Sequence, residues 1–186
     1  MSFQLGSIDR TFRDELEMTC NVDLDQCYEC GKCTGGCSTT YIMDYTPRKI
    51  VQLIKIGAVK TLLSCNTPWI CVTCRLCADR CPAGIDIPRI MDYLKEKALA
   101  TKDFGPGVDN VILFHKLLLE EVYRRGRISE TALALKFNLR TGQYFKDAGL
   151  GRKLLGKGKI SPLSPRVRDL DKVRSFFKQL SDRGEG

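Results

Sequence analysis

Apolar residues recur at intervals of three and four positions along most of the chain, a spacing that predicts α-helices. In the segment 46–64 they form one face, and Thr46 can cap a helix that begins at Pro47. The segment 89–100 shows the same spacing and follows Pro88. Because no pair of neighbouring segments alternates apolar and polar residues, we expect no β-sheet and an all-α fold.

Helices are also expected toward both ends of the chain, the last of them starting at Ser164 and Pro165. The predicted spans are 9–19, 108–126, 129–140 and 164–180. A Gly-Pro-Gly sequence at 105–107 interrupts the helical pattern, which is typical of a boundary. We therefore expect two domains, 1–100 and 101–186, the second of them a helical C-terminal extension without cysteine that docks partners.

Ten cysteines give the chain its chemistry. Reducing compartments disfavour disulfides, so dense cysteine there indicates metal binding or catalysis. Eight of the ten form two runs spaced C-x2-C-x2-C-x3-C, and each member of the second run lies 44 positions after its counterpart. This is the spacing of bacterial [4Fe–4S] ferredoxins. The runs are Cys27, Cys30, Cys33 and Cys37, then Cys71, Cys74, Cys77 and Cys81, which Pro82 follows.

The doubled motif predicts two [4Fe–4S] clusters that exchange their fourth ligands. In two-cluster ferredoxins three thiolates of a run hold one cluster, and the fourth ligates the other. We therefore expect Cys37 and Cys81 to cross between clusters, so that losing either one damages folding as well as redox activity. The first cluster takes Cys27, Cys30, Cys33 and Cys81, and the second takes Cys71, Cys74, Cys77 and Cys37.

Two points about the cysteines stay open at the level of sequence. Zinc sites also use C-x2-C units, but they normally take two such pairs per metal, which disfavours zinc here. Cys37 is followed by Ser38 rather than by proline, which leaves Cys20 and Cys65 as alternative ligands in its place. Free cysteine is commonly a small buried hydrophobe, and we expect that role for both.

Positive charge accumulates beyond the cysteines. The formal net charge is +8, and two oxidised clusters with their thiolates would lower it to about +4. A basic region can indicate nucleic-acid binding. Here, however, Phe176 and Phe177 fall on the apolar face of the last helix, which favours an acidic protein partner. The basic residues are Arg152, Lys153, Lys157, Lys159, Arg166, Arg168, Lys172, Arg174 and Lys178.

Charged side chains near the cysteines have two interpretations. Lys32, Arg75 and Arg80 would raise the reduction potential of a nearby cluster, or they are ordinary solvated charges. The chain shows no acid–base machinery, since its one histidine, His115, has no motif beside it. The segment 151–157 nearly matches a phosphate-binding loop but lacks its Ser/Thr, so we interpret it as a basic turn. We expect no substrate chemistry in this chain.

The strings CYECGKCTGGC and CVTCRLCADRCPAGIDIPRIM, joined by a helical connector, resemble the C-type subunits of heterodisulfide reductase from methanogenic archaea. The likeness covers essentially the whole chain and is strongest over 25–100. The resemblance implies an α-helical ferredoxin that relays electrons from the flavin-containing A-type subunit to the catalytic B-type subunit. The latter reduces the CoM-S-S-CoB heterodisulfide of methanogenesis. The resemblance also implies a larger complex with a nickel–iron hydrogenase or a formate dehydrogenase, which carries out flavin-based electron bifurcation.

The expected function is therefore that of a non-catalytic electron-transfer subunit in an oxidoreductase complex. No apolar run is long enough to span a membrane and no signal-peptide core precedes the first helix, so we expect a cytoplasmic protein. We expect neither nucleic acid nor membrane as a partner. The alternatives are an iron–sulfur relay for another oxidoreductase, such as a thiol-linked fumarate reductase, and a zinc-bearing nucleic-acid-binding module.

Overall fold

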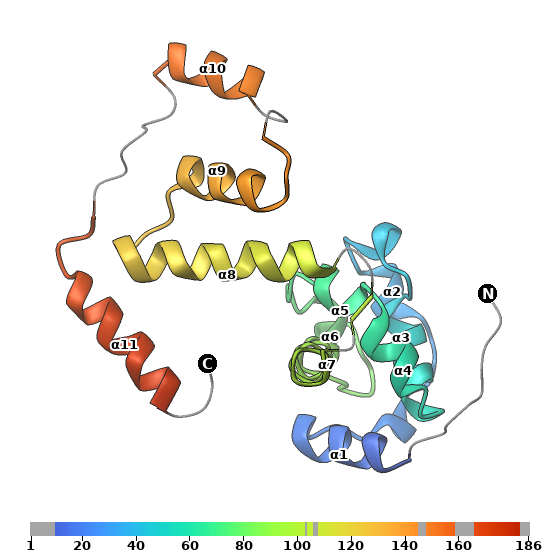
Figure 1. Ribbon diagram of the computed structural model, residues 1–186. Coiled ribbons are helices and arrows are strands. Elements are labelled where there is room, and N and C mark those ends of the chain that lie inside the picture. Colours follow the sequence, from blue (N-terminus) through green and yellow to red (C-terminus); the bar gives the residue numbers. More distant parts are fainter. Residues whose placement is uncertain (1–9, 103, 106–107, 145–147, 159–165, 183–186) are drawn as a thin grey trace. The chain divides into compact units, whose positions relative to one another are not determined.

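A computed structural model describes residues 10–102, 104–105, 108–144, 148–158 and 166–182. Within these ranges every regular element is a helix, which confirms the predicted all-α class (Figure 1). The chain divides into two compact units, Met1–Val108 and Asp109–Gly186.

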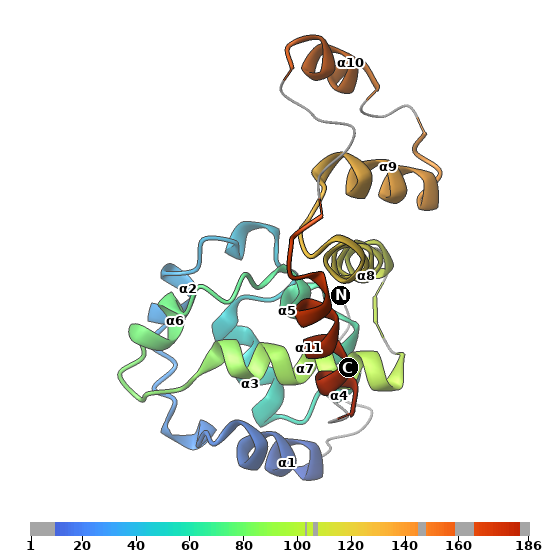
Figure 2. The same cartoon turned by 90° about the vertical axis from the view of Figure 1, so that its left-hand side faces the viewer.

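Helix α7 is the packing centre of the first unit, where it contacts α1, α4, α5 and α6 (Figure 2). Its side chains Ile90, Met91 and Leu94 are fully buried. They meet buried leucines and isoleucines of the other helices, and this contact forms the core. The elements of this unit are α1 (Arg10–Cys20), η1 (Leu24–Gln26), α2 (Lys32–Gly35), η2 (Thr40–Ile42), α3 (Pro47–Lys55), α4 (Val59–Ser64), α5 (Thr67–Ile70), α6 (Leu76–Asp79) and α7 (Ile87–Thr101).

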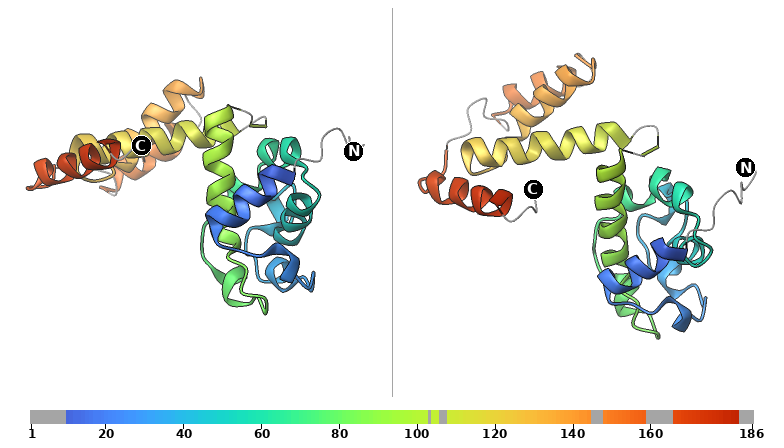
Figure 3. Two further views of the ribbon diagram at one scale, coloured as in Figure 1. Left: turned by 90° about the horizontal axis from the view of Figure 1, so that it is seen from below. Right: turned by 60° about the horizontal axis from the view of Figure 1, so that its bottom comes forward.

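Helix α1 packs against α7 and crosses it at an angle, as two further views show (Figure 3). The rings of Phe12 and Tyr93 pack with their centroids 5.9 Å apart. Lys97 Nζ lies 2.6 Å from Glu15 Oε1 at the solvent side of the same contact. The helix predicted at 9–19 is therefore present, although position 9 lies outside the described residues.

Both long connectors after the cysteine runs start with a capped, proline-led helix, as predicted. Thr46 accepts a hydrogen bond from the Lys49 N–H at 3.3 Å, and Asp86 accepts one from the Arg89 N–H at 3.4 Å. Proline in the first turn costs no hydrogen bond, because the N–H that it lacks has no partner within the helix. Helix α7 begins at Ile87, two residues earlier than predicted.

The segment 46–64, predicted as one helical stretch, forms two helices, α3 and α4. Gly57 takes a φ of +64°, in the left-handed region, and separates α3 from α4. The N–H groups of Gly57 and Ala58 turn back to carbonyl oxygens of α3, each at 2.9 Å. This is the Schellman ending of a helix, which glycine allows because it has no Cβ. The bend lets α4 pack against both α3 and α7.

The second unit contains α8 (Val108–Arg125), α9 (Glu130–Arg140), α10 (Ala148–Gly156) and α11 (Leu170–Asp182). Phe114 of α8 meets Phe137 of α9 edge to face, with ring centroids 5.8 Å apart. Tyr123 of α8 meets Phe177 of α11 in the same way at 5.7 Å. Aromatic contacts therefore attach both α9 and α11 to α8.

A buried ion pair supports the contact between α8 and α9. Glu121 is only 1% exposed. Its carboxylate oxygens lie 2.6 Å from Lys136 Nζ and 3.3 Å from Arg125 Nε. The hydrogen bond to Glu121 raises the pKa of Lys136. A buried carboxylate is tolerated only when it is paired in this way, so the three charges act as one unit.

Two predictions in the second unit need correction. The segment 151–157 is not a turn, because α10 continues to Gly156, and Arg152, Lys153 and Leu154 are good helix formers. The last helix begins at Leu170 rather than near Ser164 and Pro165, which lie outside the described residues. The N–H of Val167 donates to the Arg125 carbonyl at 3.0 Å, which joins Val167 to the end of α8 before the last helix begins.

Candidate iron–sulfur site

The first cysteine run, 27–37, consists of a tight loop followed by helix α2. Helix η1 ends just before Cys27, whose N–H donates to the Leu24 carbonyl at 3.1 Å. Glu29 and Gly31 have φ angles of +53° and +78°, so the chain enters the left-handed region twice within five residues. These two reversals wind the backbone tightly enough to present three thiols to one side.

The second run, 71–81, repeats this backbone. Thr73 and Arg75 hold the positions that correspond to Glu29 and Gly31, and their φ angles are +49° and +64°. Helix α6 follows at the position corresponding to α2. In each run the N–H of the fourth cysteine donates to the carbonyl three residues earlier, at 3.2 and 3.0 Å. The 44-residue repeat in sequence is thus a repeat of backbone conformation.

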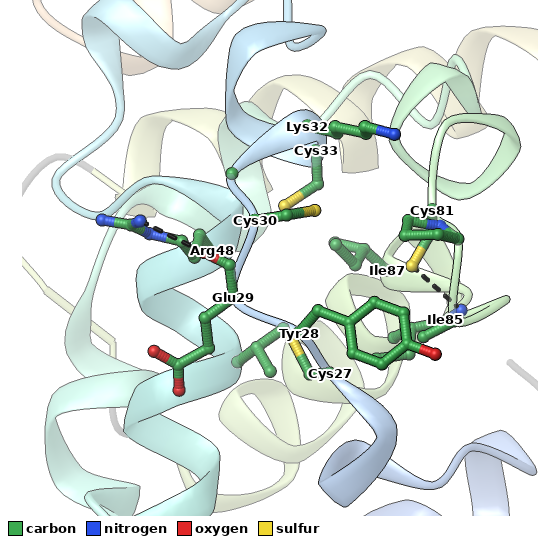
Figure 4. A pocket seen from close by; sticks show the side chains of 14 residues that line it. Cys27, Tyr28, Glu29, Cys30, Lys32, Cys33, Arg48, Cys81, Ile85 and Ile87 are labelled. Atoms are coloured by element: carbon green, nitrogen blue, oxygen red, sulfur yellow. Dashed lines mark hydrogen bonds between the residues drawn. The ribbon is translucent and has the colours of Figure 1, made fainter.

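The structure brings the last cysteine of the second run to the first run. Their side chains surround one cavity, which Figure 4 shows from close by. The buried side chains of Val51, Ile85 and Ile87 also line it. The cysteines that line it are Cys27, Cys30, Cys33 and Cys81.

A second cavity has the reciprocal composition. Cys37, from the end of the first run, lies there with three cysteines of the second run. Buried Ile87, Pro88 and Met91 of α7 also line this cavity, and Ile87 lines both cavities. The N-terminal turn of α7 therefore separates two neighbouring sites. The cysteines of the second cavity are Cys37, Cys71, Cys74 and Cys77.

The donor set of each cavity fits a [4Fe–4S] cluster. Each cavity presents four thiols and several buried apolar side chains, and thiolate sulfur is the ligand of iron in such clusters. The carboxylate of Glu29, at the rim of the first cavity, instead accepts a hydrogen bond from Gln52 Nε2 at 2.9 Å. No three His, Cys, Asp or Glu side chains in the described ranges converge tightly enough for a single metal ion.

The two crossing cysteines have polar partners. The Ile85 N–H donates to Cys81 Sγ at 3.4 Å, and the Thr39 hydroxyl lies 3.5 Å from Cys37 Sγ. Burial disfavours ionisation of Cys37, but hydrogen bonds from Thr40 and Thr39 outweigh it and lower the pKa of this thiol. As thiolates, both sulfurs would accept hydrogen bonds of the kind that tunes iron–sulfur centres.

The buried thiols of the runs behave differently. Burial raises the pKa of Cys77 to about 11, with a further contribution from neighbouring Cys71. Burial also raises the pKa values of Cys33 and Cys71. Metal binding deprotonates such thiols outright, so their ligation releases protons and couples to folding.

The remaining two cysteines lie away from both cavities. Cys20 and Cys65 are 2% and 4% exposed. The Cys20 thiol points to the Arg89 carbonyl at 3.7 Å, and the Cys65 thiol donates to the Leu62 carbonyl at 3.2 Å. Burial raises the pKa of Cys20 to about 11. These surroundings are those of small core residues, and Cys37 is the cysteine placed beside the second run.

A reciprocal set of hydrogen bonds, which sequence analysis missed, connects the two runs. Asp44 and Asn66 each donate a backbone N–H to the other's side chain at 2.8 Å. Buried Thr67 accepts from the Tyr45 N–H and donates to the Tyr45 carbonyl, both at 2.9 Å. These contacts hold the segment after Cys37 against α5, which leads into the second run. Partners 22 positions apart leave no periodic signal in the sequence.

The three cationic side chains named from the sequence, Lys32, Arg75 and Arg80, lie in different positions relative to the cavities. Lys32 lines the first cavity, together with Arg48, and Arg75 lines the second. Arg75 also pairs with Asp86 at 2.9 Å. Arg80 lines neither cavity, and its guanidinium lies against Gly36, where a Cβ would approach it to 2.8 Å.

Comparison with known proteins places the chain in a family. Residues 23–85 match the 4Fe-4S dicluster domain. The C-type iron-sulfur subunit of CoB–CoM heterodisulfide reductase from Methanopyrus kandleri is 35% identical over 159 residues, which cover 86% of this chain and 76% of that protein. The chain belongs to the family of heterodisulfide reductase C-type subunits. A C-type iron-sulfur subunit of the same enzyme from Methanocaldococcus jannaschii is 30% identical over 83% of this chain and 72% of its own length.

The relatives extend beyond the cysteine runs. The C-type subunit of the H2:CoB–CoM heterodisulfide, ferredoxin reductase of Methanothermobacter marburgensis is 25% identical over 93% of this chain and 83% of its own length. As a member of this family, the chain is an iron–sulfur electron-transfer subunit of an oxidoreductase complex, and the complex supplies partner subunits. Among the described residues no helix is long and apolar enough to cross a membrane.

Proposed function

We propose that this chain holds two [4Fe–4S] clusters and relays electrons from the flavin-containing A-type subunit to the catalytic B-type subunit of a heterodisulfide reductase complex. The proposal takes its partners from the family, whose members act on the CoB–CoM heterodisulfide according to their names. The first cluster would be held by Cys27, Cys30, Cys33 and Cys81, and the second by Cys71, Cys74, Cys77 and Cys37.

One observation carries the proposal: each cavity contains three cysteines of one run and the fourth cysteine of the other. A chain with two independent metal sites has no need of this exchange. The two cavities share Ile87 as a wall residue, so they are neighbours. Because of the exchange, each proposed site needs cysteines from both repeats. Two neighbouring one-electron centres in one small unit are the arrangement that a relay needs.

The chain's own groups would determine how the centres behave. Each bound cluster supplies reversible one-electron chemistry, with a potential that depends on hydrogen bonds, burial and charge. The Ile85 N–H and the hydroxyls of Thr39 and Thr40 lie at the crossing sulfurs, where they stabilise negative charge. Buried Ile87 and Met91 exclude water from the inner walls.

The surrounding complex is also part of the proposal. Relatives include an H2-dependent and an H2/formate-dependent ferredoxin reductase. We propose that a hydrogenase or a formate dehydrogenase supplies electrons and that the assembly bifurcates them at the flavin of the A-type subunit. We place it in the cytoplasm, where free thiols stay reduced.

The second unit would provide a docking surface for the partner subunits. Several of its large apolar side chains are at least 46% exposed, which is unusual for a small helical unit that works alone. Basic residues on α10 and α11 accompany them. The exposed side chains are Leu119, Tyr123, Leu135, Leu139, Tyr144 and Phe176.

The test is iron and acid-labile sulfide analysis of anaerobically purified protein, with EPR after dithionite reduction. We expect about eight iron and eight sulfide per chain and a spin-coupled signal from two nearby centres. Stoichiometric zinc without sulfide would overturn the proposal. Heterodisulfide reduction by the A-type and B-type subunits, assayed with and without this chain, tests the relay itself, and equal rates would exclude it.

A further inference from the structure

The outer rim of the first cavity is a cationic surface that the relay chemistry does not use. We refer to Tyr28, Lys32 and Arg48 as the first rim. All three are exposed, Tyr28 to 72%. The Glu29 carboxylate lies beside them and accepts a hydrogen bond from Gln52 Nε2 at 2.9 Å, so two cations face one carboxylate here. The Arg48 guanidinium donates to the backbone carbonyl of Glu29 at 3.3 Å, which orients it across the loop (Figure 4). In the described part of the chain, neither Lys32 nor Arg48 forms an ion pair with a carboxylate.

The corresponding rim of the second cavity has the opposite character. Val72 and Leu76 hold the positions that match Tyr28 and Lys32, and they are 61% and 41% exposed. The arginine that lines this cavity, Arg75, already pairs with Asp86 at 2.9 Å. The two repeats therefore present one rim with a net positive charge and one rim that is apolar and locally neutral.

We propose that the first rim is the docking surface for an acidic patch on a partner subunit, across which the first cluster exchanges electrons. The inference rests on the proposed function, since it requires a cluster behind the rim. A thiolate-bound oxidised cluster is itself anionic, so it repels an acidic partner. Lys32 and Arg48 lie between the cluster site and solvent, where they offset that repulsion and attract carboxylates.

The remaining features of the rim suit electron exchange with a specific partner. Charges at the edge of an interface chiefly set the rate of association and its salt dependence. Exposed Tyr28 offers a large, rigid contact of the type enriched at interface centres. Cys30, a proposed ligand, is itself exposed within this rim, so a docked partner would lie close to the cluster.

The experiment uses the complete chain, co-purified anaerobically with the A-type and B-type subunits. The principal variant is Lys32→Glu, because among the described residues this side chain makes no hydrogen bond or ion pair that the change would break. Arg48→Gln is the second variant. Lys60→Glu is the matched control, since Lys60 is exposed on α4, lines neither cavity and undergoes the same change of charge.

We expect Lys32→Glu to weaken the binding of one of the two partners about tenfold at physiological salt, and Arg48→Gln to weaken it less. Wild-type binding of that partner should also weaken as salt increases, while Lys60→Glu behaves as wild type. Unchanged affinity and salt dependence in Lys32→Glu would overturn the proposal, as would an equal loss in Lys60→Glu.

Iron content separates this inference from the proposed function. Each variant should keep the wild-type iron and sulfide. If wild-type protein contains no clusters, the proposed function fails and the rim has no redox role. If the clusters are intact and Lys32→Glu still binds both partners normally, only the docking assignment fails.

Discussion

The two cysteine repeats share a backbone and differ in side chains. Each contains two left-handed residues at corresponding positions, then a four-residue helix, then a fourth cysteine that faces the other repeat's cavity. Yet glycine holds the second left-handed position in one repeat and arginine holds it in the other. The ligand geometry therefore constrains the backbone, whereas the outer side chains are free to diverge.

The divergence has consequences for charge. Gly31 has no side chain, so Lys32 and Arg48 supply the positive charge at its rim. Neither has a carboxylate partner among the residues that the structure describes. Arg75 instead reaches Asp86, the residue that caps α7. One repeat therefore leaves its cations without a carboxylate partner among the described residues, and the other uses its charge to attach the loop to the central helix.

The largest expected effect comes from removing a crossing cysteine. Cys81→Ala and Cys37→Ala should each lower iron to about four atoms per chain or fewer and destabilise the unit by more than about 4 kcal/mol, as expected for loss of a metal site. Cys65→Ala is the control, which should keep the full iron content and lower the free energy of unfolding by only about 1 kcal/mol. Iron analysis and thermal unfolding under anaerobic conditions check both. Full iron in Cys81→Ala would exclude the exchanged ligation.

Next in size is substitution at the left-handed positions. Gly31→Ala should destabilise the protein by about 1–2 kcal/mol, because an L-residue is strained there. The cost is conformational, since the nearest atom to a new Cβ is Arg48 Nη1 at 3.9 Å. Arg75→Gly relieves the same strain but loses the contact with Asp86, so its effect should be smaller. Denaturant unfolding measures the stability of both variants. If Arg75→Gly destabilises the protein as much as Gly31→Ala, the strain at position 75 is smaller than the backbone repeat suggests.

The two helix caps provide a smaller comparison. Thr46→Ala and Asp86→Ala should each cost about 1 kcal/mol, because each leaves an N–H of the first turn without its acceptor. Asp86→Ala should cost more, since it also removes the partner of Arg75. Asp92→Ala, on the exposed side of α7, is the control. A larger loss of stability in Thr46→Ala than in Asp86→Ala would contradict the stabilising role given to the Asp86–Arg75 ion pair.

The smallest effects concern reduction potentials. Lys32→Gln should lower the potential of the first cluster by an amount on the order of tens of mV, because an unpaired cation near the cluster favours the more negative reduced state. Arg75→Gln should lower the potential of the second cluster less, since Asp86 already offsets the arginine. Redox titration followed by EPR measures both shifts. If Arg75→Gln shifts the potential of the second cluster as much as Lys32→Gln shifts that of the first, the ion pair with Asp86 does not weaken the effect of Arg75 on the potential.

The sequence by itself determined what depends on neighbours along the chain. Thr46 and Asp86 predicted helix starts, because a cap and a following proline act within one turn. The cysteine spacing predicted the ligand type and the duplication, and with them the chemistry. These signals are local, so they do not depend on how distant segments pack.

Tertiary structure decided the features that depend on distant partners. The hydrogen bond from Val167 to Arg125 joins the residues before α11 to the end of α8, and the contact of Thr67 with Tyr45 aligns the two repeats. Which cation is neutralised also depended on the fold, since Arg75 meets Asp86 only after the loop and α7 have packed. Such contacts join groups that the sequence keeps apart, and side-chain charge alone does not reveal which carboxylate, if any, lies within reach.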